Sequence, residues 1–155
     1  RLKGSMLGYK LHMYDLYVPV IEIEKEKIPF EESVKRANKA LASLGEAYLK
    51  IFNEGIESGW VDIYQNKGKR GGAYSWGSYD TMPYVLLNYN YELNDTSTLV
   101  HEMGHSIHSY YSKKSQPYYY SGYTIFCAEI ASTTNEALLI HYLIYIFTGK
   151  IIFLN

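Results

Sequence analysis

The sequence predicts a mainly α-helical fold with a small β-sheet insert. Two patterns support this fold class. In long segments apolar residues recur at three- and four-residue steps, and in one shorter stretch, about residues 58–92, short apolar runs lie between glycines and a proline. No internal repeat or low-complexity linker interrupts the chain. We therefore expect residues 1–155 to be part of a single domain.

Composition restricts the class of protein. The 155 residues are 47% hydrophobic and 20% charged, as in folded proteins, and the net charge is -1. This balance gives no electrostatic reason to expect nucleic acid or an anionic membrane as a partner. The single cysteine, Cys127, excludes an intrachain disulfide, and we expect it to be a small core residue. The longest apolar stretch, residues 137–147, is about half a membrane span, so we expect a soluble, cytoplasmic protein.

The N-terminal third contains one predicted helix. Residues 9–23 are expected to be a short irregular or extended segment, and Pro29 then opens the helix. Its apolar stripe consists of Val34, Ala37, Leu41, Leu44, Tyr48 and Ile51. Because the stripe keeps helical spacing throughout, we expect one helix that ends near residues 53–55.

Three short strands are expected in the insert. Residues 60–64 alternate between apolar and polar side chains, residues 74–76 form a second candidate, and residues 85–91 form a third that begins after Pro83. The first two strands are separated by the turn-forming residues Gly68, Gly71 and Gly72.

Two helices should follow the insert. Residues 94–98 are rich in N-cap types and predict a helix over about 96–111, and a second helix is predicted over about 123–147, stopped by Gly149.

The first of these helices carries the pattern His-Glu-x-x-His at His101, Glu102 and His105. Residues four apart lie on one face of an α-helix, so the two imidazoles can bind one metal ion together. Glu102 is offset along the helix, where it can act on a water at the metal without displacing a ligand. This division of roles is what the pattern provides at a zinc site.

Two further features of that helix support a site. Leu99, Met103 and Ile107 recur at four-residue steps, which gives the helix one side to bury and a different side to present the histidines. Gly104 lies inside the motif, although a mid-helix glycine costs about 1 kcal/mol. We expect it to let another backbone approach the histidine pair closely.

A third ligand is available in the next helix. Catalytic zinc sites usually use three protein ligands and a water. Glu129 is an acidic residue in the otherwise apolar stretch 125–131, where a metal would remove the cost of burying an unpaired carboxylate. Glu136 lies seven residues later on the same helix face and is placed to hydrogen-bond a ligand histidine.

The other histidines have weaker claims to a role. His108 lies three residues after His105 and could be a ligand, but a carboxylate from Glu129 is the better third donor, so we expect His108 to line the cleft or support a ligand from outside. His12 and His141 are expected to be ordinary surface or packing residues.

Several segments resemble the oligoendopeptidase F branch of the thimet-oligopeptidase-like zinc peptidases. The most specific are residues 98–109 and 126–139, which contain the histidine pair and Glu129. The resemblance extends over nearly all of residues 9–143 and includes the segments 11–17, 69–75 and 84–88.

The resemblance implies a gluzincin-like zinc peptidase core within a larger helical, channel-forming enzyme that admits short peptides. It implies one zinc ion on His101, His105 and Glu129, and Glu102 as the general base. It further implies that a strand around residues 73–76 or 85–89 pairs with the substrate backbone. The family's chains are much longer, and their transition-state-stabilising tyrosine and histidine lie farther toward the C-terminus. This chain therefore resembles one part of such an enzyme. Its apolar end, residues 142–155, departs from the family pattern.

Three functions are compatible with these observations. The first is a zinc-dependent endopeptidase that hydrolyses short oligopeptides, with no nucleic-acid or membrane partner. The alternative is a truncated chain that binds zinc or peptide without completing catalysis, because losing donors that stabilise the transition state costs roughly two to three decades in rate. A metal hydrolase of another kind that uses the same helix, such as a deformylase, is a weaker third choice.

Overall fold

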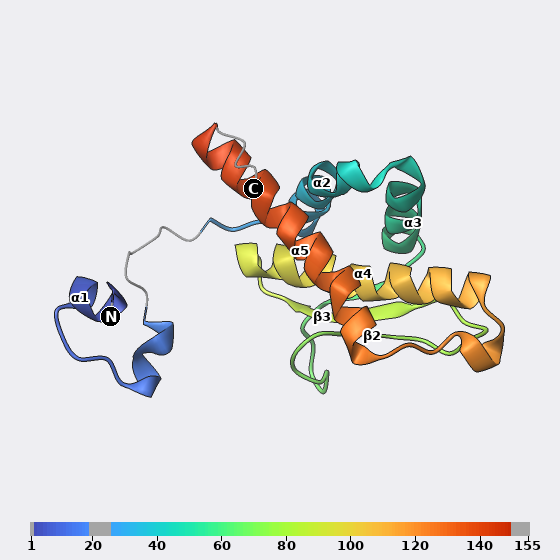
Figure 1. Cartoon of the computed structure of the whole chain (residues 1–155), viewed down its shortest axis with the longest axis horizontal. Coiled ribbons are helices and arrows are strands. Elements are labelled where there is room, and N and C mark those ends of the chain that lie inside the picture. The colour runs from blue at the N-terminus through green and yellow to red at the C-terminus, as the bar shows by residue number, and fades with distance from the viewer. Residues whose placement is uncertain (1, 19–25, 150–155) are drawn as a thin grey trace.

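The computed structural model describes residues 2–18 and 26–149 (Figure 1). The mainly helical fold with a small sheet, expected from the sequence, is confirmed. The N-terminal segment contains helix α1 (Leu2–Leu7) and the 3-10 helix η1 (Met13–Tyr17), and it lies apart from the other elements in Figure 1. Neither element was predicted, and residues 19–23 of the expected irregular segment fall outside the described residues. So do residues 150–155 of the apolar C-terminal run.

The predicted single helix after Pro29 is wrong. The chain instead forms α2 (Phe30–Ala40), a 3-10 turn η2 (Leu41–Leu44) and a separate helix α3 (Glu46–Glu57). Gly45 separates them with a φ of 90°, a left-handed conformation that favours glycine. The apolar stripe continues across the break because Ala37 and Leu41 before it and Ile51 after it are all buried. The spacing of apolar residues therefore looked like that of one helix. Periodicity alone therefore hid a change of direction.

The insert forms a three-stranded sheet with the order β1-β3-β2. Strands β1 (Val61–Tyr64), β2 (Tyr74–Trp76) and β3 (Tyr84–Tyr89) agree with the predicted positions to within two residues. The central strand β3 pairs in parallel with β1 and antiparallel with β2. Ser75 pairs with Val85, which is fully buried, so both side chains point to the same face of the sheet.

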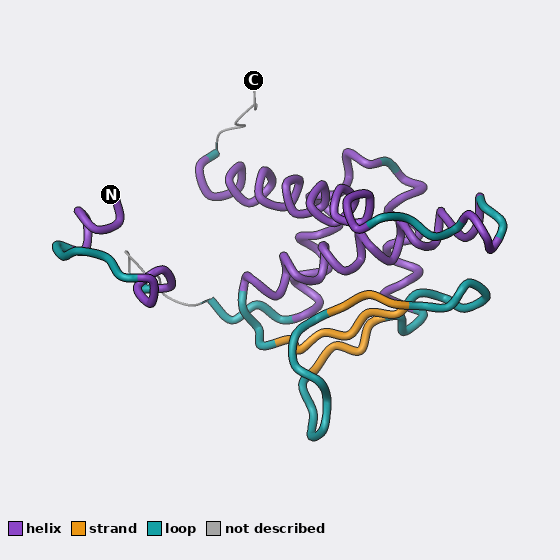
Figure 2. The backbone as a smooth tube through the Cα atoms, turned by 60° about the horizontal axis from the view of Figure 1, so that its bottom comes forward, coloured by secondary structure: helices purple, strands orange, loops and turns teal. Residues whose placement is uncertain are grey.

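Helix α4 (Leu93–Ser115) packs on the sheet and also contacts α2 and α3 (Figure 2). It begins three residues before the predicted start, because the Asp95 carboxylate accepts the backbone N–H groups of Asn90 and Glu92 and caps the first turn. Its predicted apolar side is confirmed. Leu99, Met103 and Ile107 are the buried residues that share this side.

Helix α5 (Ile125–Thr148) crosses α4 on the side away from the sheet (Figures 1 and 2). The crossing is close at Gly104, where an added Cβ would lie 2.8 Å from the Ser132 Cα atom and 3.0 Å from the Ala131 carbonyl oxygen. Asn135 is buried beside this contact, and its side-chain amide donates to the Val100 carbonyl and to the Tyr48 hydroxyl. The expected close approach at Gly104 is therefore present.

The expected burial of Cys127 is wrong, because this residue is exposed on the first turn of α5. Within residues 2–18 and 26–149, no helix combines the length and the apolar character that a membrane crossing requires.

Candidate metal centre

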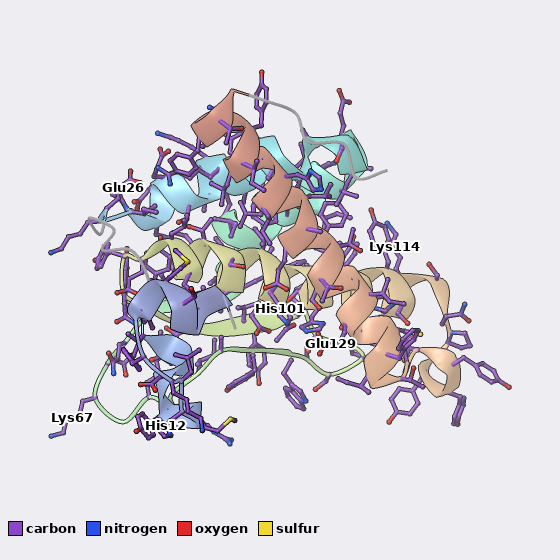
Figure 3. The ribbon with its side chains drawn as sticks, turned by 60° about the vertical axis from the view of Figure 1, so that its left-hand side comes forward. His12, Glu26, Lys67, His101, Lys114 and Glu129 are labelled. Carbon is purple, nitrogen blue, oxygen red and sulfur yellow. The ribbon has the colours of Figure 1, made fainter. Side chains whose placement is uncertain are left out.

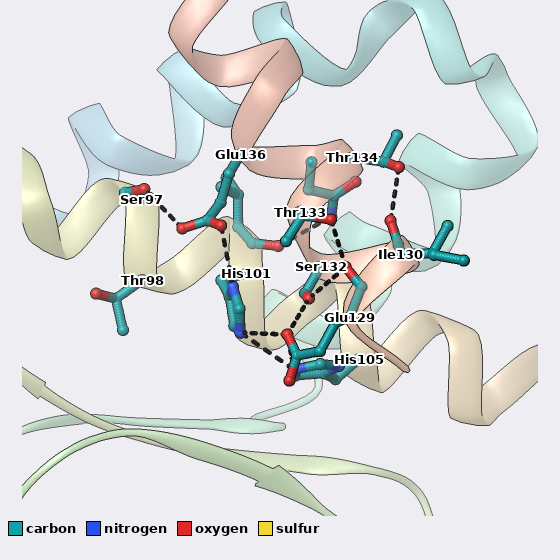
Figure 4. Close-up of polar contacts among 12 residues, drawn as sticks. Ser97, Thr98, His101, His105, Glu129, Ile130, Ser132, Thr133, Thr134 and Glu136 are labelled. Atoms are coloured by element: carbon teal, nitrogen blue, oxygen red, sulfur yellow. Dashed lines mark hydrogen bonds and ion pairs between the residues drawn. The ribbon is translucent and has the colours of Figure 1, made fainter. Parts of the chain in front are cut away.

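Three side-chain donor atoms converge between α4 and α5 (Figures 3 and 4). The Nε2 atoms of His101 and His105 lie 3.1 Å apart. The Oε2 atom of Glu129 lies 3.6 Å from the first and 3.8 Å from the second. The helical spacing of the histidines supplies two donors, and the crossing of α5 at Gly104 brings the third from another part of the chain.

The spacing of these donors fits a tetrahedral zinc ion. Bonds of about 2.0–2.1 Å at tetrahedral angles hold ligand atoms about 3.3 Å from one another. The three observed separations, 3.1, 3.6 and 3.8 Å, lie close to that value. Two imidazole nitrogens and one carboxylate oxygen are also a donor set that zinc accepts in catalytic sites. The residues present are therefore suited to one zinc ion.

The other polar atoms of these side chains have partners that orient them. His101 Nδ1 lies 3.3 Å from Oε2 of Glu136, whose second oxygen accepts a hydrogen bond from Ser97 at 3.2 Å. The His105 ring hydrogen-bonds to the Ala128 backbone carbonyl. Such contacts fix the ring orientation and leave the Nε2 atoms directed at a common point. Glu136 thus lies next to a candidate ligand histidine, the position that its spacing from Glu129 predicted.

Burial and charge act on the same groups. Burial, followed by the charge of His101, lowers the pKa of His105 below its ordinary value. A lowered pKa keeps the imidazole neutral, which is the form that can donate electrons to a metal. The Ser132 hydroxyl donates to Oε2 of Glu129 at 2.9 Å, which restrains that carboxylate as well.

Glu102 lies beside the donor group and is not part of it. Only 7% of its surface is exposed. Burial raises the pKa of the Glu102 carboxyl above its ordinary value, while the charge of His101 and a hydrogen bond from the Ser75 backbone N–H act in the opposite direction. A buried carboxyl next to a possible metal position, with a pKa above its usual range, is suited to proton transfer.

The environment predicted for Glu129 is wrong in one respect. The surrounding stretch is not a buried apolar segment, since Ile125, Phe126 and Ile130 are 75%, 74% and 53% exposed. The Glu129 side chain is itself 45% exposed. The cost of burying a carboxylate therefore does not explain its position, whereas its distance to the two histidines does.

The remaining histidines lie elsewhere. His108 is outside the group of three donors; its ring stacks on Tyr123 with the centroids 4.0 Å apart, and it lines a mainly apolar pocket between α4 and α5. His12 is exposed on the N-terminal segment, away from His101 (Figure 3). His141 lies on α5 and is partly buried.

Sequence reasoning missed the contacts that come from the sheet and from the backbone. The site residues are contacted by Ser75, Ser132 and the Ala128 carbonyl, but serine and backbone groups occur throughout the chain and carry no spacing signal.

The sheet order distinguishes between the two strands that were predicted as candidates for pairing with the substrate backbone. Strand β3 is paired on both sides, whereas β2 is an edge strand of this sheet.

Comparison with known proteins gives consistent matches. The model of peptidase family M3 matches residues 2–150. Oligopeptidase PepF of Bacillus subtilis is 55% identical over 135 residues, which are 87% of this chain and 20% of that protein. An oligoendopeptidase F homologue of Lactococcus lactis is 48% identical and is covered over 23% of its length, against 89% of this chain. The crystal structure of a candidate peptidase from Chlamydophila abortus superposes with a TM-score of 0.80 at 46% identity, covering 92% of this chain and 24% of that one. The chain thus spans about a fifth to a quarter of the length of these relatives.

Proposed function

Because this chain belongs to peptidase family M3, we propose that it is the catalytic core of a zinc-dependent endopeptidase that hydrolyses short oligopeptides. The observation that carries the proposal is the convergence of His101, His105 and Glu129 beside the buried Glu102. The names of the relatives, an oligopeptidase and an oligoendopeptidase F homologue, support peptides as the substrate class.

In this proposal His101, His105 and Glu129 hold one zinc ion. When bound, zinc supplies Lewis-acid chemistry, which polarises a carbonyl and lowers the pKa of water to near neutrality. Glu136 and the Ala128 carbonyl keep the two imidazoles turned toward the ion. Ser132 holds the Glu129 carboxylate in place from its own helix.

Glu102 is the proposed general base. It accepts a proton from the attacking water and then delivers that proton to the leaving amine of the scissile peptide bond. Its burial excludes bulk water from the carboxylate, and the raised pKa brings its proton affinity closer to that needed at neutral pH. Glu102 is adjacent to His101 in sequence but does not contribute to the donor group, so the two roles do not compete.

We propose that the peptide substrate lies along β2. This strand forms one edge of the sheet, and its central residue Ser75 contacts Glu102. An extended peptide can add to a strand edge through backbone hydrogen bonds, which do not depend on the substrate's sequence. Here these bonds would use backbone groups other than the Ser75 N–H, which Glu102 accepts. This placement would bring the substrate backbone next to the general base.

Metal content and peptide cleavage test the proposal together. We expect the chain to bind one equivalent of zinc and to cleave an internally quenched short peptide, and a chelator should abolish cleavage until zinc is restored. Atomic absorption and fluorescence measure the two quantities. Cleavage that survives complete removal of the metal would contradict the assignment.

A second candidate function, zinc or peptide binding without turnover, is favoured by the exposure of the Glu129 side chain, which is 45%. In this alternative the three donors hold zinc, and peptide binds beside it, without turnover. One equivalent of tightly bound zinc without any cleavage in the same experiment would support this alternative.

The contact between Glu136 and His101 leads to a separate prediction. Replacing Glu136 with alanine should weaken zinc binding about 10- to 100-fold, because the His101 ring loses the partner that orients it. Competition with a fluorescent zinc chelator measures the affinity. Ser97→Ala, which removes only the donor to the far oxygen of Glu136, should have a smaller effect. Equal affinities for Glu136→Ala and the unaltered chain would show that this contact does not support the metal site.

A further inference from the structure

The edge strand β2 is joined to α4 by a pair of hydroxyl groups. The Oγ atoms of Ser75 and Ser106 lie 2.7 Å apart, within hydrogen-bonding distance. Ser106 is completely buried, so its hydroxyl has no access to water and depends on this partner. The register explains the contact, because Ser75 pairs with the buried Val85 and therefore points toward the helices.

The same strand residue contacts the candidate general base. The Ser75 backbone N–H donates to the Glu102 carboxylate. Glu102 and Ser106 are four residues apart on α4, so they present adjacent side chains to β2. Ser75 thus makes two contacts with α4. Its hydroxyl group bonds to Ser106, and its backbone N–H donates to Glu102.

A third contact from α4 fixes the chain just beyond β2. Lys113 lies seven residues after Ser106, two turns farther along the helix. Its Nζ atom donates to the carbonyl oxygens of Gly77 and Ser78 at 3.0 and 2.8 Å. Strand β2 has only three residues and pairs on one side only, so sheet hydrogen bonds alone hold it weakly. Its position relative to α4 therefore depends on these side-chain contacts.

We propose that Ser106 is a positioning residue for peptide hydrolysis, holding Ser75 so that the Ser75 N–H orients the Glu102 carboxylate. The inference rests on the function proposed above, and it adds a determinant outside the His-Glu-x-x-His pattern. Ser106 touches neither the substrate nor the metal donors in this role and acts entirely through Ser75. Strand β2 is also the strand on which the peptide substrate is proposed to lie. The contact between Ser75 and Ser106 would therefore position both the general base and the peptide backbone relative to α4.

The kinetic test uses Ser106→Ala, Ser75→Ala and the double variant in the zinc-loaded full chain. Each single variant should lower kcat about tenfold while KM changes less than about twofold, because the base is misaligned but the strand edge remains. The double variant should be no slower than either single variant, since all three lose the same contact. Zinc affinity should remain within about twofold of the unaltered chain, because the donor atoms are untouched. Ser115→Ala, at the exposed end of α4, is the matched control and should leave kcat unchanged.

Additive losses in the double variant, or an unchanged kcat in Ser106→Ala, would overturn the inference. Ser75→Ala alters a strand residue that is only partly buried, so it remains informative if Ser106→Ala fails to fold.

A second measurement requires no turnover. Amide hydrogen exchange at Ser75, followed by NMR, should accelerate at least about tenfold in both Ser106→Ala and Glu102→Ala, while the core strand β3 stays protected. Unchanged protection of Ser75 in Ser106→Ala would overturn the inference whether or not any peptide is cleaved. Absence of cleavage by the unaltered, zinc-loaded chain would instead contradict the proposed endopeptidase function, and the two failures are therefore distinguishable.

Discussion

Replacing Glu102 with glutamine should lower kcat for peptide cleavage by roughly 10²- to 10⁴-fold while one equivalent of zinc stays bound. Glutamine has nearly the same shape and can still accept the Ser75 N–H through its side-chain oxygen. It cannot accept a proton from water at neutral pH. The three donor atoms lie on His101, His105 and Glu129, so the substitution leaves the candidate metal site intact. Steady-state kinetics and zinc analysis on the same preparation measure the two outcomes.

A matched control is available on α3. Glu57→Gln makes the same chemical change at an exposed position and should leave both kcat and zinc content unaltered. Peptide cleavage by Glu102→Gln at the rate of the unaltered chain would rule out Glu102 as the general base. Loss of zinc together with loss of activity would show instead that Glu102 supports metal binding.

Replacing Gly104 with alanine should destabilise the fold by about 1–3 kcal/mol and weaken zinc binding at least about tenfold. Helix propensity alone predicts the opposite, a gain of about 1 kcal/mol. The added methyl group, however, would lie 2.8 Å from the Ser132 Cα atom and 3.0 Å from the Ala131 carbonyl oxygen. Both are backbone atoms and cannot rotate away, so α5 must shift. Because Glu129 lies on α5, that shift moves one donor away from the two histidines.

Urea denaturation and zinc titration test this prediction. Gly71→Ala is the control, since its Cβ would meet no atom within 4 Å and its backbone φ is not positive. We expect that variant to match the unaltered chain in both measurements. A Gly104→Ala variant more stable than the unaltered chain would show that the α4–α5 crossing can widen at little cost.

The sequence predicted the elements that carry a strong local pattern. The apolar side of α4, the three strands and the final helix could be located because each residue's role is set by its near neighbours. The same holds for His101 and His105, whose meeting follows from helix geometry. Glu129 and Glu136 could be proposed from helix-face spacing and charge, although burial was the wrong argument for Glu129.

Features that depend on packing between elements could not be predicted in this way. The break at Gly45 changes the direction of the chain without interrupting the apolar stripe, so periodicity gave no sign of it. The link from Ser106 through Ser75 to Glu102 joins residues about thirty positions apart in sequence, and its central part is a backbone N–H group. Residue type does not indicate such contacts, because every residue except proline has a backbone N–H group.

The division of the three donors between α4 and α5 couples metal affinity to the docking equilibrium of two helices. The undocked chain still has two histidines on α4, but Glu129 is then out of reach, so the apparent zinc dissociation constant is the intrinsic one divided by the docked fraction. Substitutions in the interface, for example at the buried Asn135, which donates to the Val100 carbonyl of α4, should therefore leave zinc affinity unchanged while docking remains nearly complete. Once docking is marginal, each further loss of about 1.4 kcal/mol should weaken affinity tenfold. By the same linkage, saturating zinc should restore folding to variants that have lost it.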